Sequence, residues 1–236
     1  MREFHYPVFL DLRGRDCVVV GGGEVAYGKV LGLLPCGPRV RVISPEVHRG
    51  IARLAQAGHL GWEPRAYRDG DLAGAFLVIA ATDEPAVNEA VYREAVAERA
   101  LVNVVDVPER CQFIDAALFR RGRLTAAIST GGASPALAAR LKQELGRFWG
   151  PEYGQLVSLY RRIRPVIMAR IPTVGARKRF WTHLVAQNEP LRLLRERRRD
   201  ELGAFLEREI ERAGGAADGE GSAAVPSPPG TAGGVA

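Results

Sequence analysis

A glycine-rich segment near the start of the chain has the residue types of a turn that binds a dinucleotide. Gly21, Gly23 and Ala26 fit a G-x-G-x-x-A spacing and follow the apolar run Cys17–Val20. In such turns the first glycine permits the tight bend, the second lets the backbone approach a pyrophosphate, and the alanine lets helix and strand pack closely. Amides at the start of the helix would bind the phosphates. We predict cofactor contacts at Gly21, Gly22 and Gly23, although a tight turn of another α/β protein could have the same spacing.

The end of the second predicted strand, residues 39–43, departs from the usual dinucleotide pattern. An acid normally stands there and binds the ribose hydroxyls, whereas this chain has Ser44, followed by Pro45 and Glu46. Ser44 and Glu46 could share the ribose contact. Alternatively, Ser44 caps a helix with Pro45 in its first turn, and Glu46 complements the helix dipole. No basic residue stands at Ser44 to receive a 2′-phosphate, which favours NAD over NADP.

Two further strand ends carry polar residues. Thr82 and Asp83 follow the apolar run 76–81, and Asp106 follows the next one. Ligands of parallel sheets bind beyond the carboxyl ends of the strands, so Thr82 could contact the cofactor, or it could cap the next helix together with Asp83. Asp106 could accept the proton released when a hydride leaves a substrate, or it could be an ordinary turn residue. Asn103, inside its strand, is predicted to be a hydrogen-bonding core residue.

A second glycine-containing turn, residues 129–135, precedes a predicted helix. Its amides and hydroxyls could bind a carboxylate, or Ser134 could simply cap the helix. A hairpin turn upstream, residues 120–123, carries three arginines that could bind substrate carboxylates or could be merely exposed. The candidate substrate contacts in the two segments are Arg120, Arg121, Thr130, Gly131 and Ser134.

An alternation of strands and helices over the first half of the chain would position the first group of candidates. Apolar strands are predicted near residues 17–20, 39–43, 60–64, 76–81 and 101–105, with helical patterns between most of them. This alternation predicts a Rossmann-like α/β fold with a parallel sheet and right-handed crossovers.

The pattern changes after Asp106. Residues 113–119 and 124–129 predict a hairpin, residues 136–148 a helix, and residues 152–212 further helices with breaks near Pro172 and Pro190. From Gly214 the chain is mostly glycine, alanine, serine and proline, which predicts a disordered tail. The predicted parts are a nucleotide-binding domain over 1–112, a hairpin-containing segment over 113–150, a helical C-terminal domain over 151–213 and the tail over 214–236.

The composition is that of a globular protein, with 47% hydrophobic residues and a net charge of +6. The charge is carried mainly by arginine and mixed with acids, so it does not by itself indicate a nucleic-acid partner. No apolar run has the length of a membrane span, and the start of the chain lacks a signal-peptide pattern. We expect a cytoplasmic protein with reduced cysteines. The four histidines are too scattered to predict a metal site.

The motifs occur in an order that resembles one family. They are, along the chain, Val19–Ala26, Ala80–Asp83 with Asn88, Asn103–Asp106, Phe113 and Ser129–Pro135. In this order they resemble the precorrin-2 dehydrogenase family, the dehydrogenase-chelatase module of siroheme synthase. The resemblance is good over about residues 6–148 and loose over the helical remainder.

The resemblance implies an enzyme that uses NAD to oxidise precorrin-2, a polycarboxylate tetrapyrrole, to sirohydrochlorin on the route to siroheme. In bifunctional members the same site also inserts ferrous iron. The resemblance further implies a homodimer formed partly through the segment after Asp106, which makes residues 113–150 a dimerisation segment. The essential aspartate of the family falls on Asp106. The cofactor contacts fall on Gly23, Glu24, Val25 and the segment Ser44–Glu46.

Two other functions are compatible with such a chain. One is a non-catalytic homologue that binds and regulates an earlier enzyme of tetrapyrrole synthesis, such as glutamyl-tRNA reductase. Loss of the aspartate or of the glycine motif would be its mark, and both are present here. The other is a ligand-sensing Rossmann module that regulates ion channels. The predicted hairpin, the turn at residues 129–135 and the long helical region argue against it.

Overall fold

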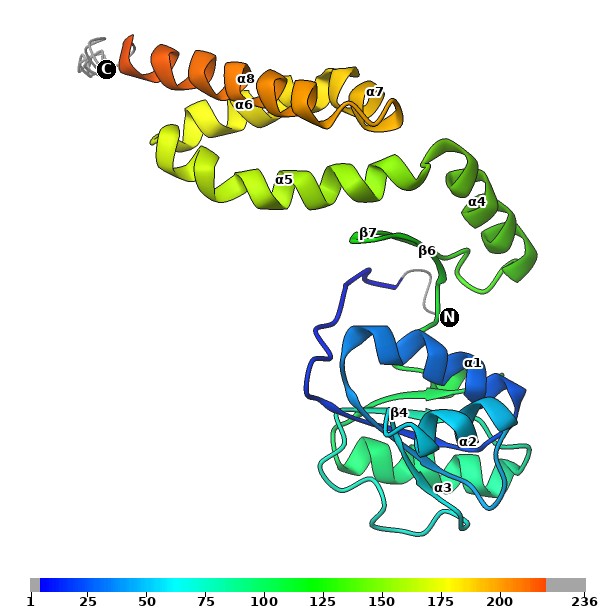
Figure 1. Ribbon diagram of the computed structural model, residues 1–236. Helices are drawn as coiled ribbons and strands as arrows, with labels where there is room; N and C mark the ends of the chain where they lie inside the picture. The colour runs from blue at the N-terminus through cyan, green and yellow to red at the C-terminus, as the bar shows by residue number, and fades with distance from the viewer. Residues whose placement is uncertain (1–4, 220–236) are drawn as a thin grey trace, which may run out of the picture. The chain divides into compact units, whose positions relative to one another are not determined.

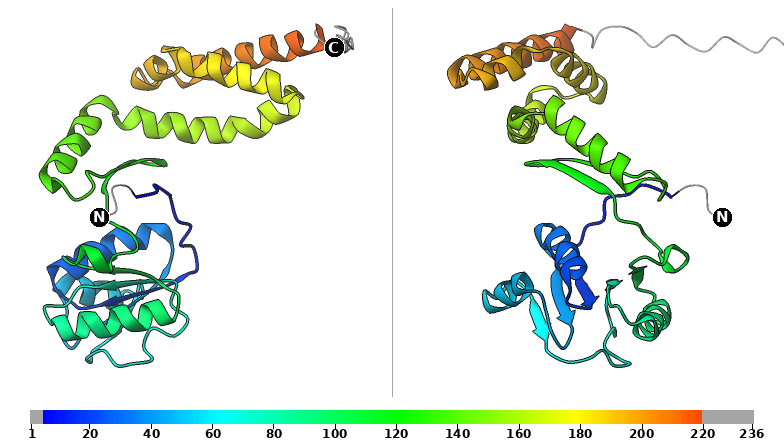
Figure 2. Two further views of the ribbon diagram at one scale, coloured as in Figure 1. Left: turned by 180° about the vertical axis from the view of Figure 1, so that it is seen from behind. Right: turned by 90° about the vertical axis from the view of Figure 1, so that its right-hand side faces the viewer.

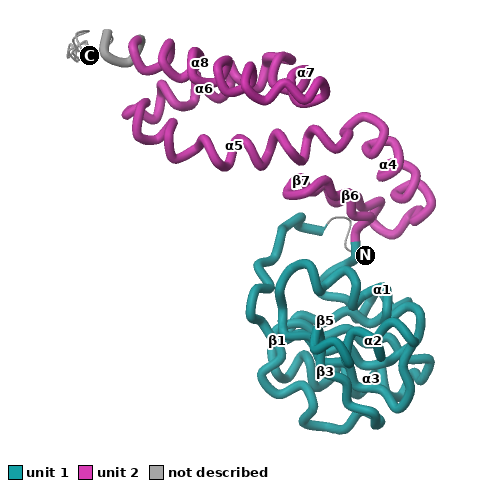
Figure 3. The backbone as a smooth tube through the Cα atoms, viewed as in Figure 1, with its two compact units in different colours: residues 1–115 teal, residues 116–236 magenta. Residues whose placement is uncertain are grey.

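The computed structural model describes residues 5–219, with side chains as far as residue 215. The chain divides into two compact units, unit 1 up to Asp115 and unit 2 from Ala116 (Figure 3). Two clusters of buried apolar residues lie in unit 1, on either side of its sheet, and a third lies in unit 2. The predicted end of the nucleotide-binding domain, residue 112, lies close to the division between the units.

Unit 1 is built on a five-stranded sheet in the order β3-β2-β1-β4-β5, and every paired strand is parallel. Aliphatic side chains dominate the three central strands, as expected where both faces of a sheet are covered. In the register, Val20 pairs with Ile43 and Ala80, and Ala80 pairs with Val104. Four strands therefore end level with one another, at what we call the carboxyl edge. The strands are β1 (Asp16–Val20), β2 (Arg39–Ile43), β3 (Gly61–Glu63), β4 (Leu77–Ala80) and β5 (Leu101–Val104).

Helices cover both faces of this sheet (Figures 1 and 2). Side chains of β1 alternate between the faces, so that Val19 belongs to one core cluster and Val20 to the other. The cluster of Val19 contains residues of α1 (Glu24–Leu33) and α2 (Arg49–Gln56), and the cluster of Val20 contains residues of α3 (Pro85–Ala97). Short 3₁₀ turns follow α1 at Leu34–Cys36 and β5 at Pro108–Arg110. The predicted Rossmann-like fold is confirmed.

Unit 2 begins with an antiparallel hairpin and continues as helices. Gly122, with a φ of +56°, lies in the turn of the hairpin. The four helices after α4 share one core, in which Ile167, Phe180, Leu193 and Leu206 are buried. The hairpin and the helical C-terminal region predicted from the sequence are both present. The elements are β6 (Ala117–Arg121), β7 (Leu124–Ile128), α4 (Pro135–Phe148), α5 (Pro151–Arg170), α6 (Val174–Ala186), α7 (Glu189–Arg195) and α8 (Arg199–Gly219).

Two predicted starts of elements are wrong. The second helix begins at Arg49 with His48 as its cap, and not at Ser44, because the Ser44 amide still bonds the Glu63 carbonyl at the end of the sheet. The hairpin begins at Ala117 and not at Phe113. Phe113 packs instead against the core of unit 1, and its carbonyl accepts a hydrogen bond from the Asn103 side chain at 2.9 Å.

The predicted start of the disordered tail at Gly214 is also wrong. Helix α8 continues through this position to Gly219. No proline, the strongest helix breaker, follows in this stretch before Pro226. The rest of the predicted tail, residues 220–236, lies outside the described residues.

Candidate functional site

The three glycines after β1 have different surroundings. Gly21 has a φ of +113°, and a Cβ there would lie closer than 3.0 Å to the Ala81 carbonyl. A Cβ on Gly22 would similarly meet the Glu46 carbonyl. These two glycines therefore let the turn pack against the ends of β4 and β2. A Cβ on Gly23 would find no described atom within 4 Å, so Gly23 leaves an open approach to the backbone, as the motif predicts.

Helix α1 starts at this turn with unused hydrogen-bond donors. Gly23 is its N-cap, and no side chain in the described part of the chain caps it. The amides of Glu24, Val25 and Ala26 likewise have no acceptor among the described residues, whereas Tyr27 N bonds Gly23 O at 3.0 Å. Free amides at a helix start bind phosphate groups. The open face of Gly23 and these three amides therefore fit the pyrophosphate of a dinucleotide.

The segment after β2 distinguishes the two roles considered for Ser44 and Glu46. Ser44 is only 8% exposed, and its hydroxyl donates to the Glu46 carbonyl at 2.6 Å. Its own carbonyl accepts a hydrogen bond from the Trp62 indole. Glu46 is exposed, as is Pro45, and it lies ahead of the first turn of α2. Glu46 therefore lies outside the first turn of α2, where it was considered as a complement to the helix dipole, and the Ser44 hydroxyl shapes the loop.

Thr82 lies in the turn after β4, beside Gly21. Its hydroxyl donates to Asn88 Oδ1 at 2.9 Å, and the Asn88 amide donates back to the Thr82 carbonyl at the same distance. Asn88 lies on α3 and is nearly buried. No side chain caps α3 among the residues described here. The Thr82 side chain thus ties the turn to α3, and its amide lies close to the glycine turn.

Asp106 lies directly beyond β5, and the preceding residue is tied to the sheet because Val105 N bonds Ala80 O at 2.9 Å. Its φ of +62° is in the left-handed region, which aspartate tolerates better than most residues. The side chain is exposed and makes no hydrogen bond or ion pair with the described residues. A free carboxylate here can accept a proton. Asn103 is a buried hydrogen-bonding residue, as predicted.

Cys17 and Cys111 of unit 1 are poor candidates for a nucleophile. Burial raises the pKa of the Cys17 thiol to about 11, and it also raises the pKa of Cys111. Cys111 Sγ donates to the Val104 carbonyl at 3.2 Å. Both groups are therefore thiols at neutral pH and not reactive thiolates. The described residues contain no group of three or more His, Cys, Asp or Glu side chains that could hold a metal ion.

The candidate residues of unit 2 are mostly engaged in local contacts. Arg120 is exposed, and the Arg121 guanidinium packs over the Phe119 ring at 5.0 Å. In the turn before α4, Thr130 Oγ1 accepts from Ser134 N at 3.0 Å, and Ser134 Oγ caps the helix by accepting from Leu137 N. Gly131, with a φ of +61°, donates its amide to Ser129 Oγ.

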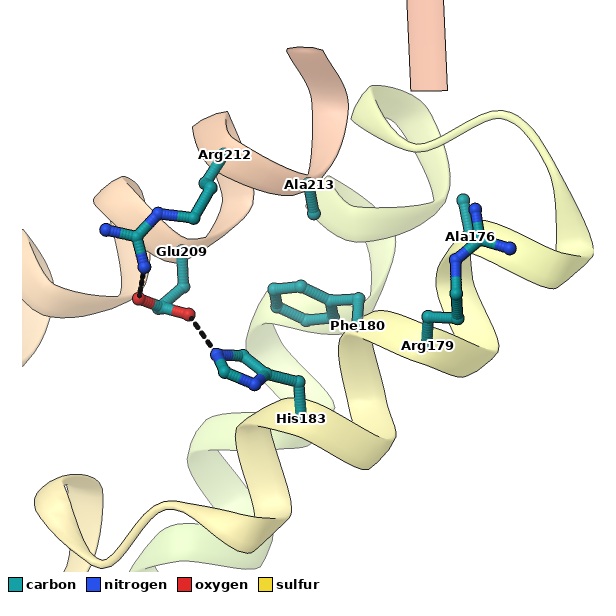
Figure 4. Close-up of a pocket in the computed structure, with 7 residues that line it drawn as sticks. All are labelled: Ala176, Arg179, Phe180, His183, Glu209, Arg212 and Ala213. Atoms are coloured by element: carbon teal, nitrogen blue, oxygen red, sulfur yellow. Dashed lines mark hydrogen bonds and ion pairs between the residues drawn. The ribbon is translucent and has the colours of Figure 1, made fainter. Parts of the chain in front are cut away.

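A pocket within unit 2 contains the most buried acid of the helical region (Figure 4). The Glu209 side chain is 8% exposed and bonds His183 Nε2 and Arg212 at 3.0 Å each. The Gln187 amide donates to the same carboxylate at 3.2 Å. Because three groups satisfy this carboxylate, the cluster ties α6 to α8 and does not present an unused acid.

The residues brought together at the carboxyl edge are therefore Gly21, Gly22, Gly23, Glu24, Val25, Ser44, Pro45, Glu46, Thr82 and Asp106. Sequence reasoning missed one residue of this region, His48. Its backbone amide bonds the Gly22 carbonyl at 2.7 Å. No motif spacing marks it, because its partners are distant in the sequence. None of the helices in the described chain is long and apolar enough to cross a membrane.

Comparison with known families agrees with this geometry. Residues 8–117 match the family described as "Putative NAD(P)-binding", residues 121–147 match "Sirohaem biosynthesis protein central", and residues 152–210 match "Sirohaem synthase dimerisation region". The chain is thus an NAD(P)-binding protein of the Rossmann type, followed by regions typical of sirohaem synthase. The prediction of a nicotinamide dinucleotide as cofactor is confirmed by this match.

Relatives identify the family more closely. Siroheme synthase of Nitrosococcus oceani is 40% identical over 177 residues, which are 75% of this chain and 38% of that protein. Siroheme synthase of Thioalkalivibrio sulfidiphilus is 39% identical over 207 residues, 87% of this chain and 42% of the relative. The chain therefore spans about two fifths of the length of these curated relatives.

A solved structure matches over its whole length. The structure titled "SirC, precorrin-2 dehydrogenase" superimposes with a TM-score of 0.72 and 31% identity, covering 88% of this chain and 100% of that one. The chain belongs to the precorrin-2 dehydrogenase family, which is also the dehydrogenase-chelatase module of siroheme synthase.

Proposed function

We propose that this chain catalyses the NAD-dependent oxidation of precorrin-2 to sirohydrochlorin. The observation that carries the proposal is the carboxyl edge of unit 1. There an open glycine turn with free helix amides lies at the end of β1, and a free carboxylate lies at the end of β5, with only β4 between these strands. The order of the strands reverses between β1 and β4, which is where α/β sheets of this type bind their ligands.

The protein would hold the cofactor mainly through its backbone. The amides of Glu24 and Val25 would bind the pyrophosphate, and Gly23 would let it approach. Glu46, with the loop shaped by Ser44 and Pro45, would hold the adenosine ribose, and this acid favours NAD over NADP because it would repel a 2′-phosphate. Thr82 would fix the turn beside the pyrophosphate. When bound, NAD⁺ supplies the hydride acceptor of the reaction.

Asp106 would supply the proton acceptor. Oxidation removes a hydride and a proton from the substrate, and a carboxylate without an internal partner is able to take the proton. The left-handed backbone at Asp106 projects the carboxylate from a short turn that is tied to β4 and β5. We also propose that Arg120 binds carboxylates of the tetrapyrrole and that Thr130, Gly131 and Ser134 provide further substrate contacts. Arg121, whose guanidinium packs over the Phe119 ring, is a further candidate.

Two further features of the family are part of the proposal. Residues 152–210 match a dimerisation region, and we propose a homodimer whose dimerisation segment includes residues 113–150. We also propose that Asp106 assists insertion of ferrous iron into sirohydrochlorin by accepting pyrrole protons, with iron as a substrate. Incubating the protein with sirohydrochlorin and Fe²⁺ and following siroheme formation tests this second activity separately.

The substitution Asp106→Asn tests the catalytic role. Asparagine tolerates the left-handed backbone as well as aspartate does, so the variant should fold and bind NAD⁺ normally. Loss of a general base should lower the rate of sirohydrochlorin formation by about 10²–10⁴-fold. Absorbance of the product, NAD⁺ calorimetry and a thermal melt on one preparation provide the measurements. Glu109→Gln, an exposed acid in the same connection, is the matched control and should keep its activity. Near-normal turnover by a stable Asp106→Asn protein would contradict the assignment.

A further inference from the structure

His48 connects the two halves of the proposed cofactor site. Its amide donates to the Gly22 carbonyl at 2.7 Å, and its Nε2 lies 3.2 Å from a carboxylate oxygen of Glu24. On the other side of the ring, Nδ1 accepts from Gly50 N at 3.0 Å and so caps α2. The same ring stacks on Tyr27 of α1, with ring centres 4.4 Å apart. One side chain therefore links the glycine turn, the start of α1 and the start of α2.

The hydrogen bond to Gly50 defines what the ring offers to Glu24. Because Nδ1 accepts a hydrogen bond from the Gly50 amide, Nδ1 carries no hydrogen of its own, and the hydrogen of the neutral ring is on Nε2. Nε2 is thus a donor toward the Glu24 carboxylate. Tyr27 stacks on the His48 ring and helps to keep it in this orientation. Gly50 makes room for the Tyr27 ring, since a Cβ at Gly50 would lie closer than 3.0 Å to that ring.

Glu24 is the acid closest in sequence to the free amides of α1. It occupies the first turn of the helix, directly after the N-cap Gly23, and its side chain is 81% exposed. An acid in this position is attracted by the positive end of the helix. If it turned back onto the first-turn amides, it would occupy the donors that the proposed function assigns to the pyrophosphate, and its charge would repel the phosphates.

We propose that His48 is a positioning residue that draws the Glu24 carboxylate toward α2 and so keeps the first-turn amides of α1 available for the cofactor. This inference rests on the proposed function, since it needs a dinucleotide at the glycine turn. The loop after β2 would then have two roles. Glu46 would contact the ribose, and His48 would keep the Glu24 carboxylate away from the position of the pyrophosphate.

The test is a double-mutant cycle on NAD⁺ affinity. In His48→Asn, the asparagine oxygen can still cap α2 by accepting from Gly50 N, but no ring remains to bond Glu24. Releasing the carboxylate should weaken NAD⁺ binding about 2- to 5-fold, the range expected for one charge at a helix start. In a Glu24→Gln background the same substitution should have no effect, because no competing charge remains. Calorimetry with NAD⁺ measures the four affinities, and thermal melts check that each variant is folded.

The possible outcomes distinguish a failure of the role proposed for His48 from a failure of the proposed NAD⁺ site. A loss that appears with Glu24 and disappears with Glu24→Gln supports the positioning role. An equal loss in both backgrounds would mean that His48 acts only through the structure of the loop, and no loss in either would mean that it does not hold Glu24. Both results overturn the inference. If the unaltered chain itself failed to bind NAD⁺, the proposed function would fail together with it.

Discussion

The chain contains two glycine turns that each follow a strand and open a helix, and they differ in what is done with the helix amides. At residues 21–23, before α1, no side chain among those described caps the helix, and Gly23 faces open space. At residues 129–134, before α4, Ser134 caps the helix, and Ser129 and Thr130 accept amide protons within the turn. The first turn leaves its donors available for a ligand. The second uses the Leu137 amide and two amides of the turn itself for internal hydrogen bonds.

The difference shows that glycine content alone does not identify a phosphate-binding site. Both turns contain glycines in the left-handed region, Gly21 in one and Gly131 and Gly132 in the other. The two turns differ in the N-cap residue of the helix that follows, which is Gly23 before α1 and Ser134 before α4. Ser134 accepts from the Leu137 amide in the first turn of α4, whose first residue, Pro135, has no N–H, whereas Gly23 leaves the first-turn amides of α1 to an external acceptor. The comparison favours the turn at Gly23 as the place where an anion binds.

The largest expected effect on stability is at Gly21. In Gly21→Ala the new Cβ would meet the Ala81 carbonyl closer than 3.0 Å, and the φ of +113° is unfavourable for alanine. We expect the free energy of unfolding of unit 1 to fall by about 3–5 kcal/mol, measured by thermal or denaturant melts. Gly131→Ala is the matched control. Its Cβ would have no described neighbour within 4 Å, so only the backbone cost of about 1–2 kcal/mol should remain. Equal losses would show that close packing is not what distinguishes Gly21.

The next effect concerns binding. Gly23→Asp introduces no clash among the described atoms, and aspartate is a better N-cap than glycine, so stability should be kept or slightly raised. The new carboxylate would take the amides and repel the pyrophosphate. NAD⁺ affinity should therefore fall by about 100-fold or more. Calorimetry is the measurement, and unchanged affinity in the folded variant would remove this turn from the cofactor site.

The smallest effect is expected at the second turn. Ser134→Ala removes the hydroxyl that accepts from Leu137 N, and loss of such a cap costs about 1 kcal/mol. A melt should show this loss, while NAD⁺ affinity should stay at the value of the unaltered chain. Weaker NAD⁺ binding by this variant would mean that the two turns are not as distinct as their hydrogen bonds indicate.

Local patterns allowed much of the fold to be predicted. The apolar runs that became β1, β4 and β5 and the G-x-G-x-x-A spacing could be interpreted without the structure, because strand alternation and tight turns depend on neighbouring residues. The placement of Asp106 after a strand followed from the same reasoning. The helix breaks near Pro172 and Pro190 were predicted from the cost of proline in a helix interior, although α5 continues through Pro165 and Pro190 lies in the first turn of α7.

The sequence by itself therefore determined the elements and the ends of strands where candidate residues lie. Only the tertiary structure decided which of those residues still have hydrogen-bonding groups available for a ligand. Whether Ser44 or Glu46 is available depends on a bond between Ser44 and the Glu46 carbonyl, and the start of α2 depends on His48. Phe113 belongs to unit 1 because of Asn103. Such bonds form between groups that the fold brings together or that a turn orients, and neither residue type nor spacing specifies them.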